Sequence, residues 1–282
     1  MNDIIGYNER MRATMEDKMW FVSHLPEHID TIIDFGCADG SLMRALDEKY
    51  PGRFKFYFGI DESEEMINLA LRHPDNKKVK MQYNIIANVN ALKLYGHFKP
   101  KHSVLILNSV IHEMFNYKND AKEEDVNFYG SYSHCKYFDT IMKDIEAMGV
   151  PCIAIRDMYA KLEYYYDAIA LIRKLEQCKV KEQFNEYHSY FSKNYHEMFP
   201  GFMYVGNYVA FDFLMKWFYT DNWDREMKEF YFWNWLPQLL MDHTYPIKHV
   251  EYFNIPYVVD KAKELGVDMY WNTHAKLLLM KK

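Results

Sequence analysis

The fold of this chain is decided by one stretch, Thr31-Ile32-Ile33-Asp34-Phe35-Gly36-Cys37-Ala38-Asp39-Gly40-Ser41-Leu42. It begins as a short apolar run typical of a buried strand, continues as a glycine-containing turn and ends as the start of a helix. A second apolar strand, Phe58-Gly59-Ile60-Asp61, ends on an acid about 20 residues after the turn. A strand, a glycine turn and a distant acid are the parts of a site for a nucleotide-like cofactor.

Strand and helix patterns alternate around this stretch. Apolar runs predict strands at 31–35, 54–60, within 80–86, at 103–108, 151–155, 247–253 and 274–280. Helical spacing and helix-end residues predict helices at 41–49, 61–72, 138–148 and 258–265. This alternation predicts an α/β fold with a parallel sheet and helices on its faces.

The chain divides into three parts by pattern. Residues 1–24 predict an N-terminal helical segment, with one amphipathic helix at 8–23. Residues 25–159 and 246–282 carry the strand–helix alternation and form the cofactor-binding domain. Residues 160–245 have mostly helical spacing, so we expect a helical insertion that covers the mouth of the sheet and caps the substrate.

Composition excludes several classes of protein. At 282 residues, 49% hydrophobic and 26% charged, the chain has the balance of a folded domain carrying a large core. A net charge of −6 argues against a broadly basic nucleic-acid-binding protein. No apolar run reaches the ~18 residues of a membrane span, and no signal peptide is recognisable.

The four cysteines point to a reducing compartment. They are dispersed and form no CxxC pair, so we expect a cytoplasmic protein without a metal site. His188 and His196 lie eight residues apart, which is not a tight ligand spacing, and we expect them to be surface or core residues.

The glycine turn fails two common nucleotide patterns. In the dinucleotide pattern GxGxxG, Ala38 would replace the second glycine and Ser41 the third. The turn also lacks the GK[ST] ending of a P-loop. It carries instead an acid, Asp34, whose carboxylate can accept hydrogen bonds from an amine-bearing ligand and would sit badly beside a pyrophosphate.

At this point the chain resembles the class I S-adenosylmethionine-dependent methyltransferases. Asp34, Gly36 and Gly40 match their first motif, acid-x-Gly-x-x-x-Gly. Asp61 matches the acid that ends their second strand, and the segment Asn108-Ser109-Val110-Ile111-His112 is similar to the one after their fourth strand. The resemblance covers 25–158 and 246–282. It implies a Rossmann-like, mostly parallel seven-stranded sheet with helices on both faces and an insertion between strands five and six.

The resemblance implies S-adenosyl-L-methionine as cofactor and a role for each matched residue. The methionine part would lie against Asp34 and the backbone of the turn, at Gly36, Cys37, Ala38 and Gly40. The ribose hydroxyls would donate to Asp61, and Glu62 and Met66 would flank the ribose and adenine. Asn88 and Val89 would meet the adenine, and Asn108 and Ser109 would line the floor beneath the sulfonium.

Two of these assignments have alternatives. Many family members place an acid near the adenine, where this chain offers Asn88 or Asn90. An amide can also pair with the adenine amino group, because it carries both a donor and an acceptor. Asp61 could instead be an acid at a helix N-terminus, where the helix dipole favours it.

Methyl transfer needs a general base only if the acceptor must lose a proton. His112 is the candidate base, because it follows the fourth strand and can titrate near neutral pH. Glu113 could orient His112 or bind substrate. Asp157, at the end of the fifth strand, is another candidate catalytic residue, because ligands of open α/β sheets bind at the carboxyl ends of strands. The alternative is that His112 packs beneath the cofactor without a proton role.

The sequence leaves the methyl acceptor open. Aromatic runs in the insertion, Tyr164-Tyr165-Tyr166 and Trp233-Asn234-Trp235, could form an apolar pocket for a small molecule. The same rings could stack on the bases of an RNA or DNA end. The low positive charge favours the small molecule. Further alternatives are a cofactor-binding regulatory or assembly protein without turnover, and an enzyme that uses the cofactor for other chemistry.

Overall fold

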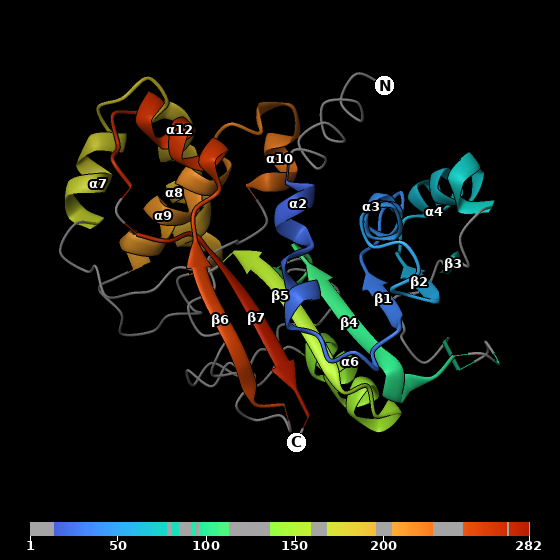
Figure 1. Ribbon diagram of the computed structural model, residues 1–282. Helices are drawn as coiled ribbons and strands as arrows, with labels where there is room; N and C mark the ends of the chain where they lie inside the picture. Colours follow the sequence, from blue (N-terminus) through green and yellow to red (C-terminus); the bar gives the residue numbers. More distant parts are fainter. Residues whose placement is uncertain are drawn as a thin grey trace.

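The computed structural model describes residues 14–77, 81–84, 92–93, 96, 98–112, 136–158, 168–195, 205–227, 245–269 and 271–281. The strands form one seven-stranded sheet with helices on both faces, which confirms the predicted Rossmann-like α/β fold (Figure 1). The bounds of the strands are β1 Thr31–Phe35, β2 Phe56–Ile60, β3 Met81–Asn84, β4 Ser103–Asn108, β5 Cys152–Met158, β6 Ile247–Phe253 and β7 His274–Met280.

The strand order is β3-β2-β1-β4-β5-β7-β6. β1 to β5 are parallel, and β7 runs antiparallel to both β5 and β6. The order reverses between β1 and β4, which lie side by side although β2 and β3 come between them in the chain. Ligands of open α/β sheets bind at such a switch point, outside the carboxyl ends of the strands.

Helices connect or flank these strands. Their bounds are α2 Met15–Lys18, η1 Trp20–His24, α3 Ser41–Lys49, α4 Glu64–Arg72, η2 Pro74–Lys77, η4 Pro100–His102, α6 Lys136–Met148, α7 Ala168–Leu175, α8 Lys181–Tyr195, α9 Val205–Lys216, η6 Thr220–Asn222, α10 Trp223–Glu226 and α12 Pro256–Glu264. Among the described residues, no helix is both long and apolar enough to cross a membrane.

The sheet separates two apolar layers. β1 and the first five residues of β4 are buried on both faces, as expected for central parallel strands. On one face, Ile33 belongs to the same buried cluster as Ile145 of α6. On the other face, Ile32 belongs to the cluster of Phe21 in η1 and Leu46 in α3. The N-terminal segment is therefore part of the core.

The helices between β5 and β6 gather beyond the carboxyl end of β5 (Figure 1). Their apolar residues, such as Phe213 of α9, continue the layer that contains α6. Inside them, Lys216 Nζ lies 2.5 Å from Asp212 Oδ2, with both side chains fully buried. The Tyr187 hydroxyl donates to the same carboxylate. The carboxylate therefore has partners of its own inside the apolar core, as a buried charge requires.

Two expectations were wrong in detail. In the described part of the N-terminal segment, α2 and η1 replace the single helix expected at 8–23, with a break at Met19. The fifth strand does not end at 155, because β7 pairs with β5 as far as Met158. Asp157 is the second-last residue of β5, so it lies at the end of the strand as expected.

Candidate active site at the carboxyl end of the sheet

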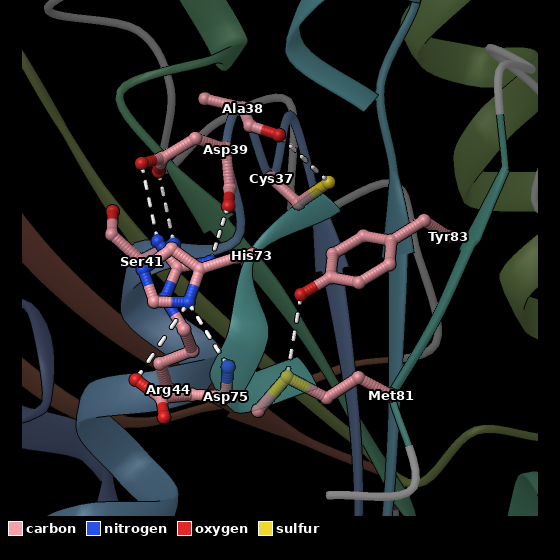
Figure 2. Close-up of polar contacts among 9 residues, drawn as sticks. All are labelled: Cys37, Ala38, Asp39, Ser41, Arg44, His73, Asp75, Met81 and Tyr83. Atoms are coloured by element: carbon pink, nitrogen blue, oxygen red, sulfur yellow. Dashed lines mark hydrogen bonds and ion pairs between the residues drawn. The ribbon is translucent and has the colours of Figure 1, made fainter. Parts of the chain in front are cut away.

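The glycine turn after β1 needs glycine at Gly36 and Gly40. Their φ angles are +76° and +75°, a region that side chains with a Cβ disfavour. A Cβ on Gly36 would lie 2.9 Å from Val110 Cγ2, and one on Gly40 would lie 2.3 Å from Tyr83 Oη. Figure 2 shows the Tyr83 ring beside this turn, which the sequence had not predicted. Glycine is therefore required at both positions, by the backbone conformation and because Val110 and Tyr83 pack directly against the turn.

Polar contacts fix the turn to α3. Asp39 Oδ1 accepts from the backbone N–H of Ser41 at 3.0 Å, and Arg44 Nη2 lies 3.1 Å from Asp39 Oδ2 (Figure 2). Cys37 is buried, and burial raises the pKa of its thiol well above 9, so this cysteine is not a nucleophile. We did not predict Asp39, although an acid just before a helix is a recognisable signal.

Asp61 joins the end of β2 to the turn. Its Oδ2 accepts from the backbone N–H of Ala38 at 2.8 Å, and its Oδ1 accepts from Ser63 at 2.9 Å. Each carboxylate oxygen can accept a further hydrogen bond. On α4, Met66 is half-buried and Glu62, just before the helix, is exposed. The helix itself is capped by the Ser63 hydroxyl, which accepts from Met66 N at 3.3 Å.

The end of β4 supplies Asn108 and Ser109. Ser109 has a φ of +53°, which turns the chain away from the sheet, and its N–H donates to the Arg156 carbonyl at 2.7 Å. Such strained backbone is common at ligand sites. Asn108 Nδ2 is buried and has no hydrogen-bond partner among the described residues.

His112 and Asp157 form a buried pair beyond the end of β4. His112 Nδ1 lies 2.8 Å from Asp157 Oδ1, and the backbone N–H of Ile111 donates to Asp157 Oδ2 at 2.7 Å. Burial by itself raises the pKa of Asp157, but His112 and the backbone N–H groups of Met158 and Ile111 outweigh it and hold the pKa below its usual value. The carboxylate is thus ionised and can only accept, so His112 Nδ1 carries a proton and donates it to Asp157.

Asp34 lies inside β1, only 3% exposed. Burial raises its pKa to about 7, against the charge of Lys18, and Asp61 adds to the rise. Lys18, on α2, is itself 4% exposed, and burial together with Arg156 lowers its pKa to about 8. The sequence did not indicate that α2 brings a lysine to the acid of the first motif.

Arg156 of β5 is a second cation that the sequence did not reveal. It is 2% exposed, its Nε donates to Asp17 Oδ2 at 2.7 Å, and its Nη1 lies 3.4 Å from Ser109 Oγ. Asp17 also pairs with Lys276 of β7, at 2.6 Å. Through Asp17, α2 is held to two strands at the edge of the cleft.

Several predicted residues lie outside the part of the chain that the structure describes. They are Asn88, Val89, Asn90, Glu113, His196 and the two aromatic runs of the insertion. Among the described residues, no group of three or more His, Cys, Asp or Glu side chains could hold a metal ion. The described residues bring Asp34, the turn, Asp61, Asn108 and Ser109 to one edge of the sheet, with the His112–Asp157 pair beside them.

Comparisons with known proteins give likenesses in fold. No protein-family model matches the chain, and no curated protein matches its sequence. The fold is similar to that of magnesium protoporphyrin IX methyltransferase from Synechocystis PCC 6803, solved with bound SAH, at 10% identity, a TM-score of 0.45 and coverage of 99% of this chain and 84% of that chain.

Two further solved structures are similar to the same degree. One is a SAM-dependent methyltransferase from Anabaena variabilis ATCC 29413, at 9% identity, a TM-score of 0.48 and coverage of 96% of this chain and 85% of that chain. The other is geranyl diphosphate C-methyltransferase from Streptomyces coelicolor A3(2), at 9% identity, a TM-score of 0.45 and coverage of 96% and 82%. At these identities and TM-scores the likenesses do not establish an activity for this chain.

Proposed function

We propose that the chain binds S-adenosyl-L-methionine at the carboxyl ends of β1, β2 and β4 and transfers its methyl group to an acceptor. The observation that carries the proposal is the contact between Asp61 and Ala38, which sets the acid of the second strand against the glycine turn. A ribose would donate its hydroxyls to the free lone pairs of Asp61, and the methionine part would lie along the backbone of the turn.

The acid at Asp34 supports a sulfonium cofactor over a dinucleotide. A pyrophosphate beside this buried carboxyl would meet like charge, whereas an α-ammonium group would find an acceptor. The strand order, with β7 antiparallel between β5 and β6, also agrees with the resemblance that the motifs indicate.

We propose that His112 acts as the general base when the acceptor must lose a proton. Asp157 would hold the imidazole so that Nε2 accepts that proton and would stabilise the imidazolium that forms. Methyl transfer then passes a methyl group from the sulfonium to the acceptor atom. The chain's other contribution is to position the two reactants and exclude water.

We propose a small molecule as the acceptor and the helical insertion as its cap. The net charge of −6 disfavours nucleic acid, and helices α7 to α10 lie beyond the carboxyl end of β5 where an acceptor would enter. A cytoplasmic location agrees with the free thiols of Cys37, Cys152 and Cys178. A nucleic-acid end as acceptor, or a cofactor-binding regulator without turnover, are the alternatives.

Binding and transfer can be measured separately. We expect S-adenosylhomocysteine, but not NAD⁺, to raise the melting temperature of the full chain, because a ligand that binds only the native state stabilises it. The absence of a shift at about 1 mM would reject the cofactor. With methyl-labelled cofactor, transfer to a pool of small molecules supports the proposed acceptor class, and transfer only to RNA overturns it. Binding without transfer to either pool favours the regulatory alternative.

A further inference from the structure

One face of the sheet carries a row of polar side chains beside the proposed cofactor site. Asn108, Arg156, Lys276 and Glu251 are successive register partners across β4, β5, β7 and β6. Register partners point to the same face of a sheet. This is the face on which α2 packs, since Asp17 of α2 contacts Arg156 and Lys276.

The charges at the outer end of this row have partners within the row. Lys276 Nζ lies 2.6 Å from Asp17 Oδ1 and 2.9 Å from Glu251 Oε1. Asp17 therefore shares its carboxylate between Lys276 and Arg156 Nε. The lysine at this end is neutralised by two carboxylates, and no ligand is needed there.

The inner end of the row has two donors without acceptors. Arg156 Nη2 and Asn108 Nδ2 are both buried, and neither has a hydrogen-bond partner among the described residues. Arg156 is 2% exposed, so bulk solvent hardly reaches its side chain. A buried polar group without a partner is destabilising, and more so if it is charged, so such groups require an explanation.

These two donors lie at the carboxyl ends of β4 and β5. Asn108 is the last residue of β4, and Arg156 is its register partner on β5. Arg156 Nη1 reaches Ser109, on the proposed cofactor floor, at 3.4 Å. Lys18 is a second buried cation, and the charge of Arg156 contributes to the lowered pKa of Lys18. Two donors without acceptors, one of them on a guanidinium with a second cation nearby, favour an anion.

We propose that Arg156 and Asn108, with Lys18 beside them, bind a carboxylate group at the carboxyl ends of β4 and β5. The inference rests on the proposed function and deepens it. The guanidinium offers N–H donors in a planar fork that matches a carboxylate, and the amide donor can bond the same group from the neighbouring strand. Asp34, one strand away on β1 and on the same face, would accept from an ammonium group, so the row and Asp34 together suit a zwitterion.

Two ligands could supply the carboxylate: the amino-acid end of the cofactor, or the acceptor. The test compares S-adenosylhomocysteine with the analogue in which only the α-carboxylate is replaced by hydrogen. Their affinities are measured by calorimetry for the wild type, Asn108→Asp and Lys18→Met. Asn108→Asp keeps the shape of the side chain but replaces the donor with a carboxylate. The control Asn222→Asp makes the same change on exposed η6, and Lys49→Met removes a lysine that pairs with α2 outside the cleft.

If the bound carboxylate belongs to the cofactor, we expect the wild type to bind S-adenosylhomocysteine at least about tenfold more tightly than the analogue, because hydrogen bonds to charged groups are worth roughly 1.5–3 kcal/mol. Asn108→Asp and Lys18→Met should reduce that preference, because each should weaken the binding of S-adenosylhomocysteine by about tenfold more than the binding of the analogue. Both controls should keep the preference. An equal loss for both ligands would indicate a structural role for these residues and would overturn the inference.

If the wild type does not discriminate, the second arm decides. Acetate is then titrated against the protein saturated with S-adenosylhomocysteine, with sodium chloride at matched ionic strength as control. A stabilisation by acetate that Asn108→Asp abolishes assigns the site to a carboxylate on the acceptor, and its absence rejects the site. If the wild type binds neither S-adenosylhomocysteine nor its analogue, the proposed function is rejected. The titration of the free protein with acetate then still tests the carboxylate site.

Discussion

The carboxylate of Asp61 accepts a hydrogen bond from the backbone N–H of Ala38 across 2.8 Å, and so joins the end of the second strand to the glycine turn. Its second oxygen accepts from Ser63 N. In Asp61→Asn, one of these N–H groups faces an amide donor instead. We expect affinity for S-adenosylhomocysteine, measured by calorimetry, to fall about tenfold to a hundredfold, since each hydrogen bond to a charged group is worth roughly 1.5–3 kcal/mol.

Asp30→Asn is the control for this substitution. Asp30 pairs with Lys55 just before β1, at the opposite end of the sheet from the turn. Its variant should bind the ligand as the wild type does. Wild-type affinity in Asp61→Asn would remove Asp61 from the cofactor site.

Gly40→Ala and Gly52→Ala form a matched pair. Both glycines have a φ of +75°, so an alanine at either position carries the same backbone strain of about 1–2 kcal/mol. A Cβ at Gly52 meets nothing within 4 Å, whereas one at Gly40 would overlap the Tyr83 hydroxyl. In urea unfolding we expect Gly40→Ala to lose clearly more stability than Gly52→Ala. Equal losses would mean that Tyr83 does not pack against the turn.

Asp34→Asn should change the stability of the protein with a defined pH dependence. The folded-state pKa of Asp34 is about 7, raised from 3.8 mainly by burial. A carboxyl raised in this way stabilises the fold below pH 3.8, and that contribution is lost as the pH rises through 7. The asparagine of the variant cannot ionise, so the variant does not lose this stability as the pH rises. We therefore expect the variant to gain about 1–3 kcal/mol relative to the wild type between pH 5 and pH 8, with part of the full effect offset because Lys18 loses a nearby carboxylate.

Asp30→Asn is again the control, because the pKa of Asp30 is shifted in the opposite direction to that of Asp34. Burial raises the pKa of Asp30, but Lys55 and Thr31 outweigh it, so the pKa is lowered and Asp30 is ionised throughout pH 5 to 8. Its variant should show no gain in this range. If urea unfolding gives the same stability difference between Asp34→Asn and the wild type at pH 5 and at pH 8, the pKa of Asp34 is not raised in the folded protein.

His112→Gln tests the proton role of the histidine. If His112 is the base, we expect kcat to fall about 10²- to 10⁴-fold for an acceptor that loses a proton, the usual contribution of general base catalysis. Affinity for S-adenosylhomocysteine should change by less than about twofold. His102→Gln is the control, because His102 lies just before the other end of β4, where its side chain contacts the carbonyl and the ring of His28. Unchanged kcat with weaker cofactor binding would assign His112 to packing.

The parts of the site that the sequence predicted are local in the chain. Asp34, Gly36 and Gly40 occupy one strand–turn–helix unit, and their spacing carries the signal. Asp61 follows from the length of one helix and one strand. Backbone conformation and strand ends decide these positions, so they can be predicted without knowing which strands become neighbours. The mostly parallel sheet was predicted for the same reason, because β-α-β connections allow few alternatives.

The cations at the cleft could not be predicted in this way. Asp17 and Arg156 are 139 residues apart, and their contact depends on how α2 crosses a sheet whose register no local pattern specifies. Lys18 is buried although lysine is usually exposed, because Asp34 and Asp39 of the first strand and turn, and its own neighbour Asp17, lie near it. Asp157 lies at the end of the fifth strand as expected, but that strand is longer than predicted because it pairs with β7.

The position of β7 in the sheet has a consequence for synthesis on the ribosome. β7 lies between β5 and β6, and its Lys276 anchors the Asp17 that holds α2 over the cleft. A nascent chain released only as far as β6 lacks the strand that seats β6 against β5. It also lacks one of the two cations that fix Asp17. The glycine turn can form early, but the sheet and the contact that holds α2 are complete only when residues 274–280 have emerged from the ribosome.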